Sequence, residues 1–136
     1  MVNVRMLEFP QKGDDRGRLV IVEGKKDVSF DIKRVFYIYG SDHDVVRGKH
    51  ANRKTEFVLI NVSGTSKVKV DDGKGNVEIY NLDKPHIGLY LPKMVWKEMY
   101  DFSKDSVLLV LASEHYDSNE YIRDYDMFLK EVNEYE

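Results

Sequence analysis

Short apolar runs separated by turn residues recur along most of the chain. Some alternate polar and apolar residues, as in Lys67-Val68-Lys69-Val70, which is the pattern of a β-strand with one solvated face. Asp72-Gly73 follows this run and predicts a hairpin turn in which the glycine has positive φ. This rhythm predicts an all-β sandwich or barrel. The runs that we expect to be strands are residues 19–22, 34–39, 56–62, 67–70, 77–81, 87–91, 96–102 and 107–112.

The pattern changes near the C-terminus, where apolar residues recur at three- and four-residue spacing, as on one face of a helix. Asp117 and Glu120 resemble a capping box, so we expect the helix to start there. We interpret its apolar stripe as packing against the β domain rather than as a ligand site. The residues of the stripe are Ile122, Tyr125, Phe128, Leu129 and Val132.

The length of 136 residues suits one domain, and no repeat, low-complexity segment or linker divides the chain. We therefore expect a single domain over residues 1–136. The longest strongly apolar run, residues 107–112, is much shorter than the roughly 20 residues of a membrane helix. The first ten residues do not have the pattern of a secretory signal, so we expect a cytoplasmic protein without a membrane partner.

Composition excludes several classes of site. The chain has no cysteine, which rules out disulfides, thiolate zinc sites and a cysteine nucleophile. A formal net charge of -3 does not suit a nucleic-acid-binding protein, for which a basic excess is expected. A local anion site remains compatible with this balance, because basic residues cluster between residues 47 and 54.

The segment 47–56 resembles the first motif of the cupins, in which two histidines one residue apart and a glutamate bind a metal ion inside a barrel. In these cupins a later strand supplies a third histidine. His50 and Glu56 are present here, but Asn52 replaces the second histidine, and a lysine in segment 88–97 replaces the third. One histidine and one glutamate beside a positive charge are a poor ligand set for zinc or iron. We therefore expect no metal.

Polar side chains inside a barrel need partners, and a polar ligand would supply them. Arginine and lysine near His50, with Arg16 in the turn 14–17, predict an anchor for a diphosphate. Aromatic residues could stack on a base or sugar. The alternative is a solvated basic edge and ordinary aromatic packing. The candidate binding residues are Arg16, Tyr37, Tyr39, Arg47, Lys49, Lys54 and Trp96, with Arg53 in the same basic cluster.

The chain resembles the dTDP-sugar 3,4-ketoisomerases, which are metal-free cupins of deoxysugar biosynthesis. The resemblance covers nearly the whole chain and includes the segments 15–17, 32–38, 47–51, 88–90, 95–96, 98–99, 107–113 and 121–126. It implies a homodimer that converts a dTDP-4-keto-6-deoxyhexose to its 3-keto isomer by proton transfer through an enediol, without metal or organic cofactor. It also implies the cupin jelly-roll barrel as the fold.

The resemblance makes His50 the expected acid–base group, because its ordinary pKa is near neutral pH. Asn52, Lys97 and Arg16 are the expected donors to the charged enediol oxygens. Members of the family usually have a second histidine at the position of Asn52, and an amide is neither a useful acid nor a useful base. In the family, variation at the positions of Lys97 and Arg16 is connected with the C4 epimer that is made.

Three other interpretations remain open from the sequence. Asn52 is either natural or an engineered replacement that traps a ligand. A chain that kept the pocket and lost the acid–base pair would be a non-catalytic sugar-nucleotide-binding protein, whereas a changed specificity would make a nucleotide-sugar epimerase. A structural or interaction protein is the remaining alternative.

Overall fold

The computed structural model describes residues 3–134, which form twelve strands, one 3-10 turn and one α-helix. The strands of the first sheet are β1 (Arg5–Glu8), β4 (Arg34–Tyr39), β6 (Phe57–Ser63), β9 (Ile87–Leu91) and β11 (Val107–Ala112). Those of the second are β5 (Arg47–Asn52), β7 (Ser66–Asp71), β8 (Val77–Leu82), β10 (Trp96–Tyr100) and β12 (Tyr121–Ile122). The remaining elements are β2 (Gln11–Asp14), β3 (Gly17–Val20), η1 (Ser118–Glu120) and α1 (Tyr125–Glu134).

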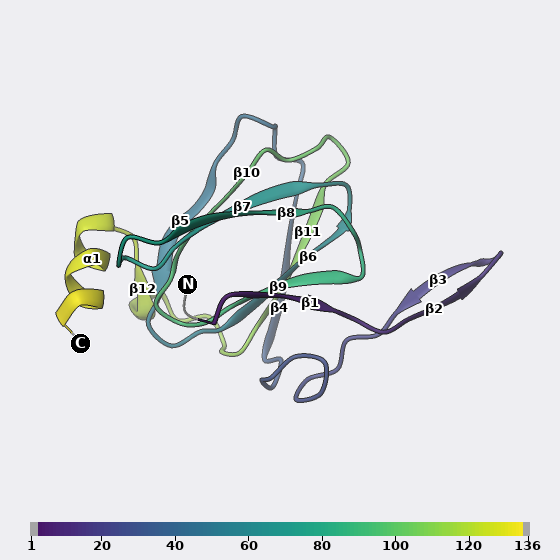
Figure 1. Cartoon of the computed structure of the whole chain (residues 1–136), viewed down its shortest axis with the longest axis horizontal. Coiled ribbons are helices and arrows are strands. Elements are labelled where there is room, and N and C mark those ends of the chain that lie inside the picture. Colours follow the sequence, from purple (N-terminus) through teal and green to yellow (C-terminus); the bar gives the residue numbers. More distant parts are fainter. Residues whose placement is uncertain (1–2, 135–136) are drawn as a thin grey trace.

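Two antiparallel five-stranded sheets face each other (Figure 1). The strand order is β1-β9-β6-β11-β4 in one sheet and β12-β5-β10-β7-β8 in the other. Alternate residues of both sheets point inward and form the main core, which includes Leu59, Val68, Leu89 and Leu108. The fold is therefore the predicted all-β jelly-roll barrel of the cupin type with a short C-terminal helix.

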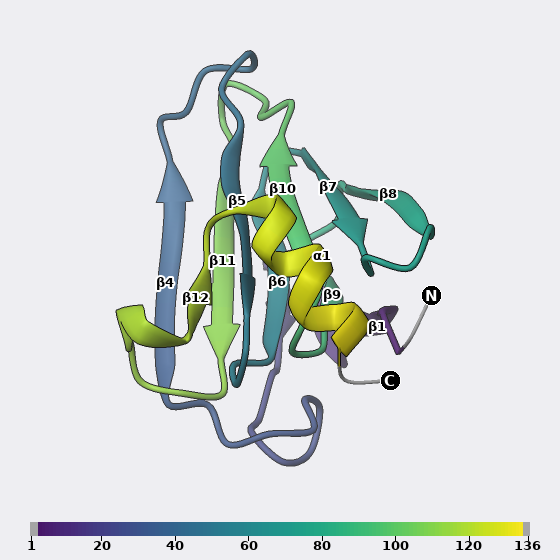
Figure 2. The same ribbon diagram turned by 90° about the vertical axis from the view of Figure 1, so that its left-hand side faces the viewer.

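Each sheet is also covered on its outer face. Phe9, Val28 and Phe30 from the N-terminal segments pack on the outside of the first sheet. Helix α1 lies across the outside of the second sheet, as Figure 2 shows, and buries Phe128 against Trp96. The two strongly buried faces fix the strand register, because a one-residue slip would turn each apolar set to the wrong side.

The C-terminal helix begins later than the sequence predicts. Asp117 and Glu120 do not start it: Asp117 caps the short turn η1, where its side chain accepts a hydrogen bond from the Asn119 backbone. The helix starts at Tyr125, and the Asp124 side chain accepts from the Met127 backbone in its first turn. The predicted capping box is wrong because the Glu120 side chain accepts hydrogen bonds from Lys54 and Thr55 and does not cap a helix.

The hairpin of β2 and β3 projects from the barrel (Figure 1). Its residues are exposed apart from Val20 at the base, and Leu19 is 59% exposed. At the predicted hairpin, Gly73 has φ 75°, which confirms the expected turn between β7 and β8. None of the helices within residues 3–134 has the length and apolar character required to cross a membrane.

Candidate active site

A bulge in β5 sets the direction of the residue that follows it. Gly48 has φ 87° and Lys49 has φ 57°, and the pairing with β10 shifts between Lys97 and Glu98. A Cβ on Gly48 would lie 2.9 Å from the backbone oxygen of Lys97, so both the space and the φ angle require glycine there. Beyond the bulge, His50 pairs directly with Lys97.

His50 and Lys97 therefore share one face of the second sheet, and each alters the protonation of the other. Burial lowers the pKa of His50 to about 4, with the positive charge of Lys97 as the next cause. Nδ1 of His50 is buried and has no partner of normal hydrogen-bond geometry among the described residues. The backbone of Gly48 raises the pKa of His50, but this effect does not outweigh burial. The imidazole is consequently neutral at pH 7 and able to accept a proton.

Lys97 is 3% exposed, and burial lowers its pKa to about 7, although the Glu120 carboxylate opposes the shift. Its Nζ donates to Oδ1 of Asn52 at 3.1 Å and lies 4.9 Å from the centre of the Phe57 ring. The ammonium group is thus desolvated, but the Asn52 oxygen and the Phe57 ring stabilise it. It titrates in the pH range in which general acids and bases operate.

Asn52 connects this lysine to a buried carboxylate. Its Oδ1 accepts from Lys97, and its Nδ2 donates to Oε2 of Glu120. A lysine can only donate and a carboxylate can only accept, so this pair of neighbours determines the orientation of the amide. Among the described residues these contacts suit a role in positioning Lys97, and the expected contact of Asn52 with the enediol stays a prediction.

Glu120 is a member of the site that sequence reasoning missed. The side chain is 5% exposed and accepts hydrogen bonds from the backbones of Lys54 and Thr55 and from the Thr55 hydroxyl, at 2.9, 3.1 and 2.8 Å. Burial raises its pKa, but these bonds and that from Asn52 outweigh burial, so the net pKa is lowered. Glu120 is therefore an ionised, fixed counter-charge for Lys97.

Aromatic rings surround the histidine and the lysine. The Tyr121 ring lies 4.9 Å from the His50 ring, and its hydroxyl accepts from Nη1 of Arg34 at 3.3 Å. The Arg34 guanidinium also lies over the Phe57 ring, and Lys97 on β10 contacts the same ring. Arg34 was not among the residues singled out from sequence, because its position in an apolar strand gave no sign of a role.

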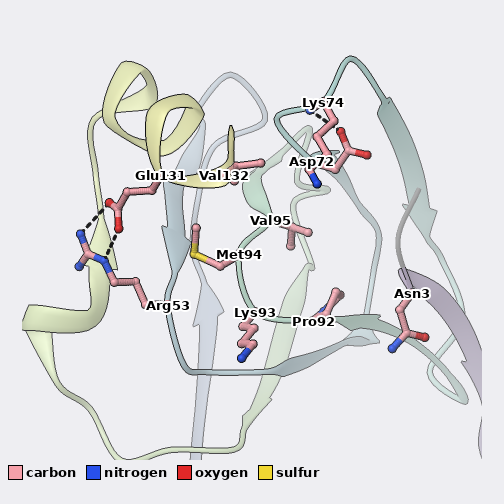
Figure 3. Close-up of a pocket in the computed structure, with 10 residues that line it drawn as sticks. All are labelled: Asn3, Arg53, Asp72, Lys74, Pro92, Lys93, Met94, Val95, Glu131 and Val132. Atoms are coloured by element: carbon pink, nitrogen blue, oxygen red, sulfur yellow. Dashed lines mark hydrogen bonds and ion pairs between the residues drawn. The ribbon is translucent and has the colours of Figure 1, made fainter. Parts of the chain in front are cut away.

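The basic cluster predicted around His50 divides in the structure. Arg47, Lys49 and Lys54 are exposed, as an anchor for a diphosphate requires. Arg53 instead points to the helix side, where it forms two 2.8 Å hydrogen bonds with Glu131. This ion pair borders a cavity of about 690 Å³ beneath α1, drawn in Figure 3, whose lining does not include His50, Asn52 or Lys97.

The aromatic residues proposed for stacking do not lie beside His50. Trp96 is on the opposite face of β10, 6% exposed, and packs against Phe128 and Tyr125. The hypothesis that Trp96 stacks on a ligand is not supported, because the side-chain alternation of the strand turns it away from Lys97. Tyr37 and Tyr39 share a face as expected, but it is the exposed outer face of β4.

Two further predicted residues are also separated from His50 within the chain. Arg16 sits at the tip of the projecting hairpin, where it pairs with Asp14. Glu56, the glutamate of the cupin-like motif, accepts a hydrogen bond from the Tyr90 hydroxyl. Tyr90 belongs to the cluster on the outer face of the first sheet, so Glu56 and His50 diverge. Within residues 3–134, His, Asp and Glu side chains form no group of three suited to a metal.

The family model FdtA, described as "WxcM-like, C-terminal", matches residues 2–133. The chain belongs to this family. An FdtA-like relative, the TDP-4-oxo-6-deoxy-alpha-D-glucose-3,4-oxoisomerase of Aneurinibacillus thermoaerophilus, is 45% identical over 128 residues, which are 94% of this chain and 91% of the relative.

Solved structures agree with the FdtA assignment. A histidine-to-asparagine mutant of the 3,4-ketoisomerase QdtA from Thermoanaerobacterium thermosaccharolyticum, in complex with TDP-4-keto-6-deoxyglucose, superposes with a TM-score of 0.96 at 42% identity. The alignment covers 98% of this chain and 96% of that one. The dTDP-4-dehydrorhamnose 3,5-epimerase of Bacillus anthracis shares only the fold, with a TM-score of 0.76 and 18% identity over 88% of this chain and 77% of the epimerase.

Proposed function

We propose that this chain is a 3,4-ketoisomerase that converts a TDP-4-keto-6-deoxyhexose to the TDP-3-keto-6-deoxyhexose in deoxysugar biosynthesis. The observation that carries the proposal is the cross-strand pair of His50 and Lys97, a neutral base beside a cation of lowered pKa. The named substrates and activities of the FdtA relatives support the choice of sugar nucleotide.

The reaction needs one base, one proton donor and stabilisation of negative charge. The C4 ketone acidifies the proton on C3, which the imidazole of His50 accepts as the electrons move to form a C3–C4 double bond. Protonation at C4 and transfer of the O3 hydroxyl proton to O4 then leave the ketone at C3 and a hydroxyl at C4. Reactant and product are isomers, so no external electron acceptor enters the balance. Burial, with the cation of Lys97 as the next cause, keeps His50 neutral, and the same cation stabilises the enediolate.

Solvent exchange tests the catalytic claim. Incubation with TDP-4-keto-6-deoxyglucose in deuterated buffer should place deuterium at C3 and C4 faster than buffer alone. A His50→Asn variant should lose this exchange by at least about 100-fold and still bind TDP, because the base is removed and the diphosphate anchor is not. The matched control His86→Asn, in a surface turn, should keep it. Exchange at the buffer rate in the wild type would contradict the proposal.

A non-catalytic sugar-nucleotide-binding protein is the alternative, because Asn52 cannot act as an acid or base. Binding of TDP without exchange would favour it. Replacement of Asn52 by histidine then separates two cases: gain of exchange would identify a degenerate enzyme, and no gain would identify a different role. A nucleotide-sugar epimerase would exchange protons but return a sugar with its ketone still at C4.

A homodimer is the proposed assembly. Val35, Tyr37 and Tyr39 on the outer face of β4 are 55%, 61% and 72% exposed, an apolar surface that a second copy would cover. Arg16 lies on a hairpin that projects from its own barrel, so its contribution to a substrate site requires a second copy (Figure 1). Light scattering should give twice the chain mass of 15.9 kDa; a monomer at micromolar concentration would contradict this.

A further inference from the structure

Arg34, the first residue of β4, has two buried donors to which none of the described residues offers an acceptor. Its Cζ lies 5.4, 5.6 and 6.0 Å from the ring centres of Phe36, Tyr116 and Phe57. Nη1 donates to the Tyr121 hydroxyl, whereas Nε and Nη2 are buried without a hydrogen-bond partner among residues 3–134. Buried donors of a permanent cation are costly to leave unpaired, which indicates a ligand.

The two unused atoms form one edge of the guanidinium plane. Their N–H bonds point in nearly the same direction, so this edge can hold two neighbouring oxygen atoms at once. Nη1 is on the other side of the group, and its bond to Tyr121 fixes the rotation of the plane. The fork is consequently pre-oriented for a planar pair of acceptors.

This fork belongs to the same end of the barrel as the acid–base pair. Tyr121 contacts Arg34 through its hydroxyl and His50 through its ring. The Phe57 ring is shared by the two cations, since its centre lies 6.0 Å from Cζ of Arg34 and 4.9 Å from Nζ of Lys97. Of the three rings over Arg34, only that of Tyr116 comes from a loop, and it is 62% exposed, so a ligand can reach the fork by displacing it.

We propose that the Nε–Nη2 edge of Arg34 binds the two oxygens on C3 and C4 of the sugar and stabilises the enediolate, which makes Arg34 a further catalytic residue; this rests on the proposed ketoisomerase function. In the enediolate these oxygens are coplanar with the C3–C4 double bond and share the negative charge, so they match the planar fork better than the ketone does. A diphosphate fits less well, because burying its charges among three aromatic rings is far more costly.

A crystal structure of the His50→Asn variant with TDP-4-keto-6-deoxyglucose tests the contact without changing Arg34. We expect Nε and Nη2 each to lie within about 3.2 Å of O3 or O4. A fork that contacts the diphosphate, or no ligand atom, would overturn the inference and leave the proposed function standing. Failure of the variant to bind any nucleotide sugar would overturn both.

Kinetics of Arg34→Lys test the catalytic role. The lysine keeps the charge but loses the fork, so kcat should fall by about 100-fold to 1,000-fold while the Kd of TDP stays within about three-fold. The matched control is Arg5→Lys, because Arg5 stacks on Tyr90 at 4.5 Å outside the site. A kcat within about three-fold of wild type, or a loss of TDP affinity that accounts for the whole loss of kcat/KM, would refute the inference.

Discussion

His50 on β5 and Lys97 on β10 are direct cross-strand partners, and the positive charge of the lysine is one cause of the low pKa of the histidine. The structure thus pairs a base that is neutral at pH 7 with a cation that titrates close to pH 7. Pairs of titratable groups whose pKa values are shifted by their environments so that one acts as a base and the other as an acid are characteristic of acid–base catalysis. We propose that the pair works without a second histidine because Lys97 is buried and held by Asn52.

The pH dependence of kcat/KM should be bell-shaped. Activity should rise through the pKa of His50, about 4, as the imidazole loses its proton, and should fall above the pKa of Lys97, about 7, as the ammonium becomes neutral. In Lys97→Arg the alkaline fall should disappear, because arginine stays charged. An alkaline limb unchanged by this substitution would assign it to another group.

The free energy of unfolding should depend on pH through Lys97. Its pKa is lowered from 10.5 in the unfolded chain to about 7 in the fold, so between these values the unfolded chain binds more protons. Stability from this group is therefore complete above about pH 10.5 and is lost as pH falls toward 7. In Lys97→Met, the free energy of unfolding measured with denaturant should lack this rise with pH, and at pH 6 it should exceed that of the wild type. Equal slopes of this free energy against pH in the two proteins would contradict the prediction.

Replacing Glu120 by glutamine should weaken both the fold and the site. The amide offers one acceptor oxygen to donors that now bind two, which should cost about 1–3 kcal/mol in unfolding free energy. The pKa of Lys97 should also fall, since Glu120 favours the charged lysine, and the alkaline limb should move to lower pH. The control Glu131→Gln breaks the partly exposed ion pair with Arg53 and should cost about 0–1 kcal/mol.

Gly48→Ala should disturb the bulge that aims His50. The new Cβ would clash with the Lys97 backbone, and alanine is strained at this positive φ. Since His50 and Lys97 would then move apart, kcat should fall by more than about ten-fold. Gly75→Ala is the matched control, because Gly75 has φ 92° but no atom within 4 Å of an added Cβ. It should lose stability by about 1–3 kcal/mol and keep its kcat. Equal losses of activity would show that backbone strain alone is responsible.

Strand alternation made most of the fold predictable, because one face of each long strand is buried. Residues 34–39, 87–91 and 107–112 are strands with the predicted limits. The strand that carries His50 was not among the predicted runs, since Arg47-Gly48-Lys49 is polar and bulged. Its histidine was found only through the resemblance to a known motif.

The candidate site was harder to predict where it depends on distant contacts. Asn52 and Glu120 are 68 residues apart, and local spacing made Glu120 look like part of a helix cap. Arg34 was missed for a related reason: its unused donors are visible only once the surrounding rings are in place. The expected stacking of Trp96 failed because the sequence does not show which side of β10 the helix covers.

The Glu120 carboxylate has a consequence for biosynthesis. Among the described elements, its turn follows every barrel strand except β12, so on the ribosome these strands emerge before the counter-charge of Lys97 does. We expect nascent chains that end before Glu120 to be inactive even where the strands that precede it have already paired. We therefore expect activity to appear only once the segment that carries Glu120 has packed against β5.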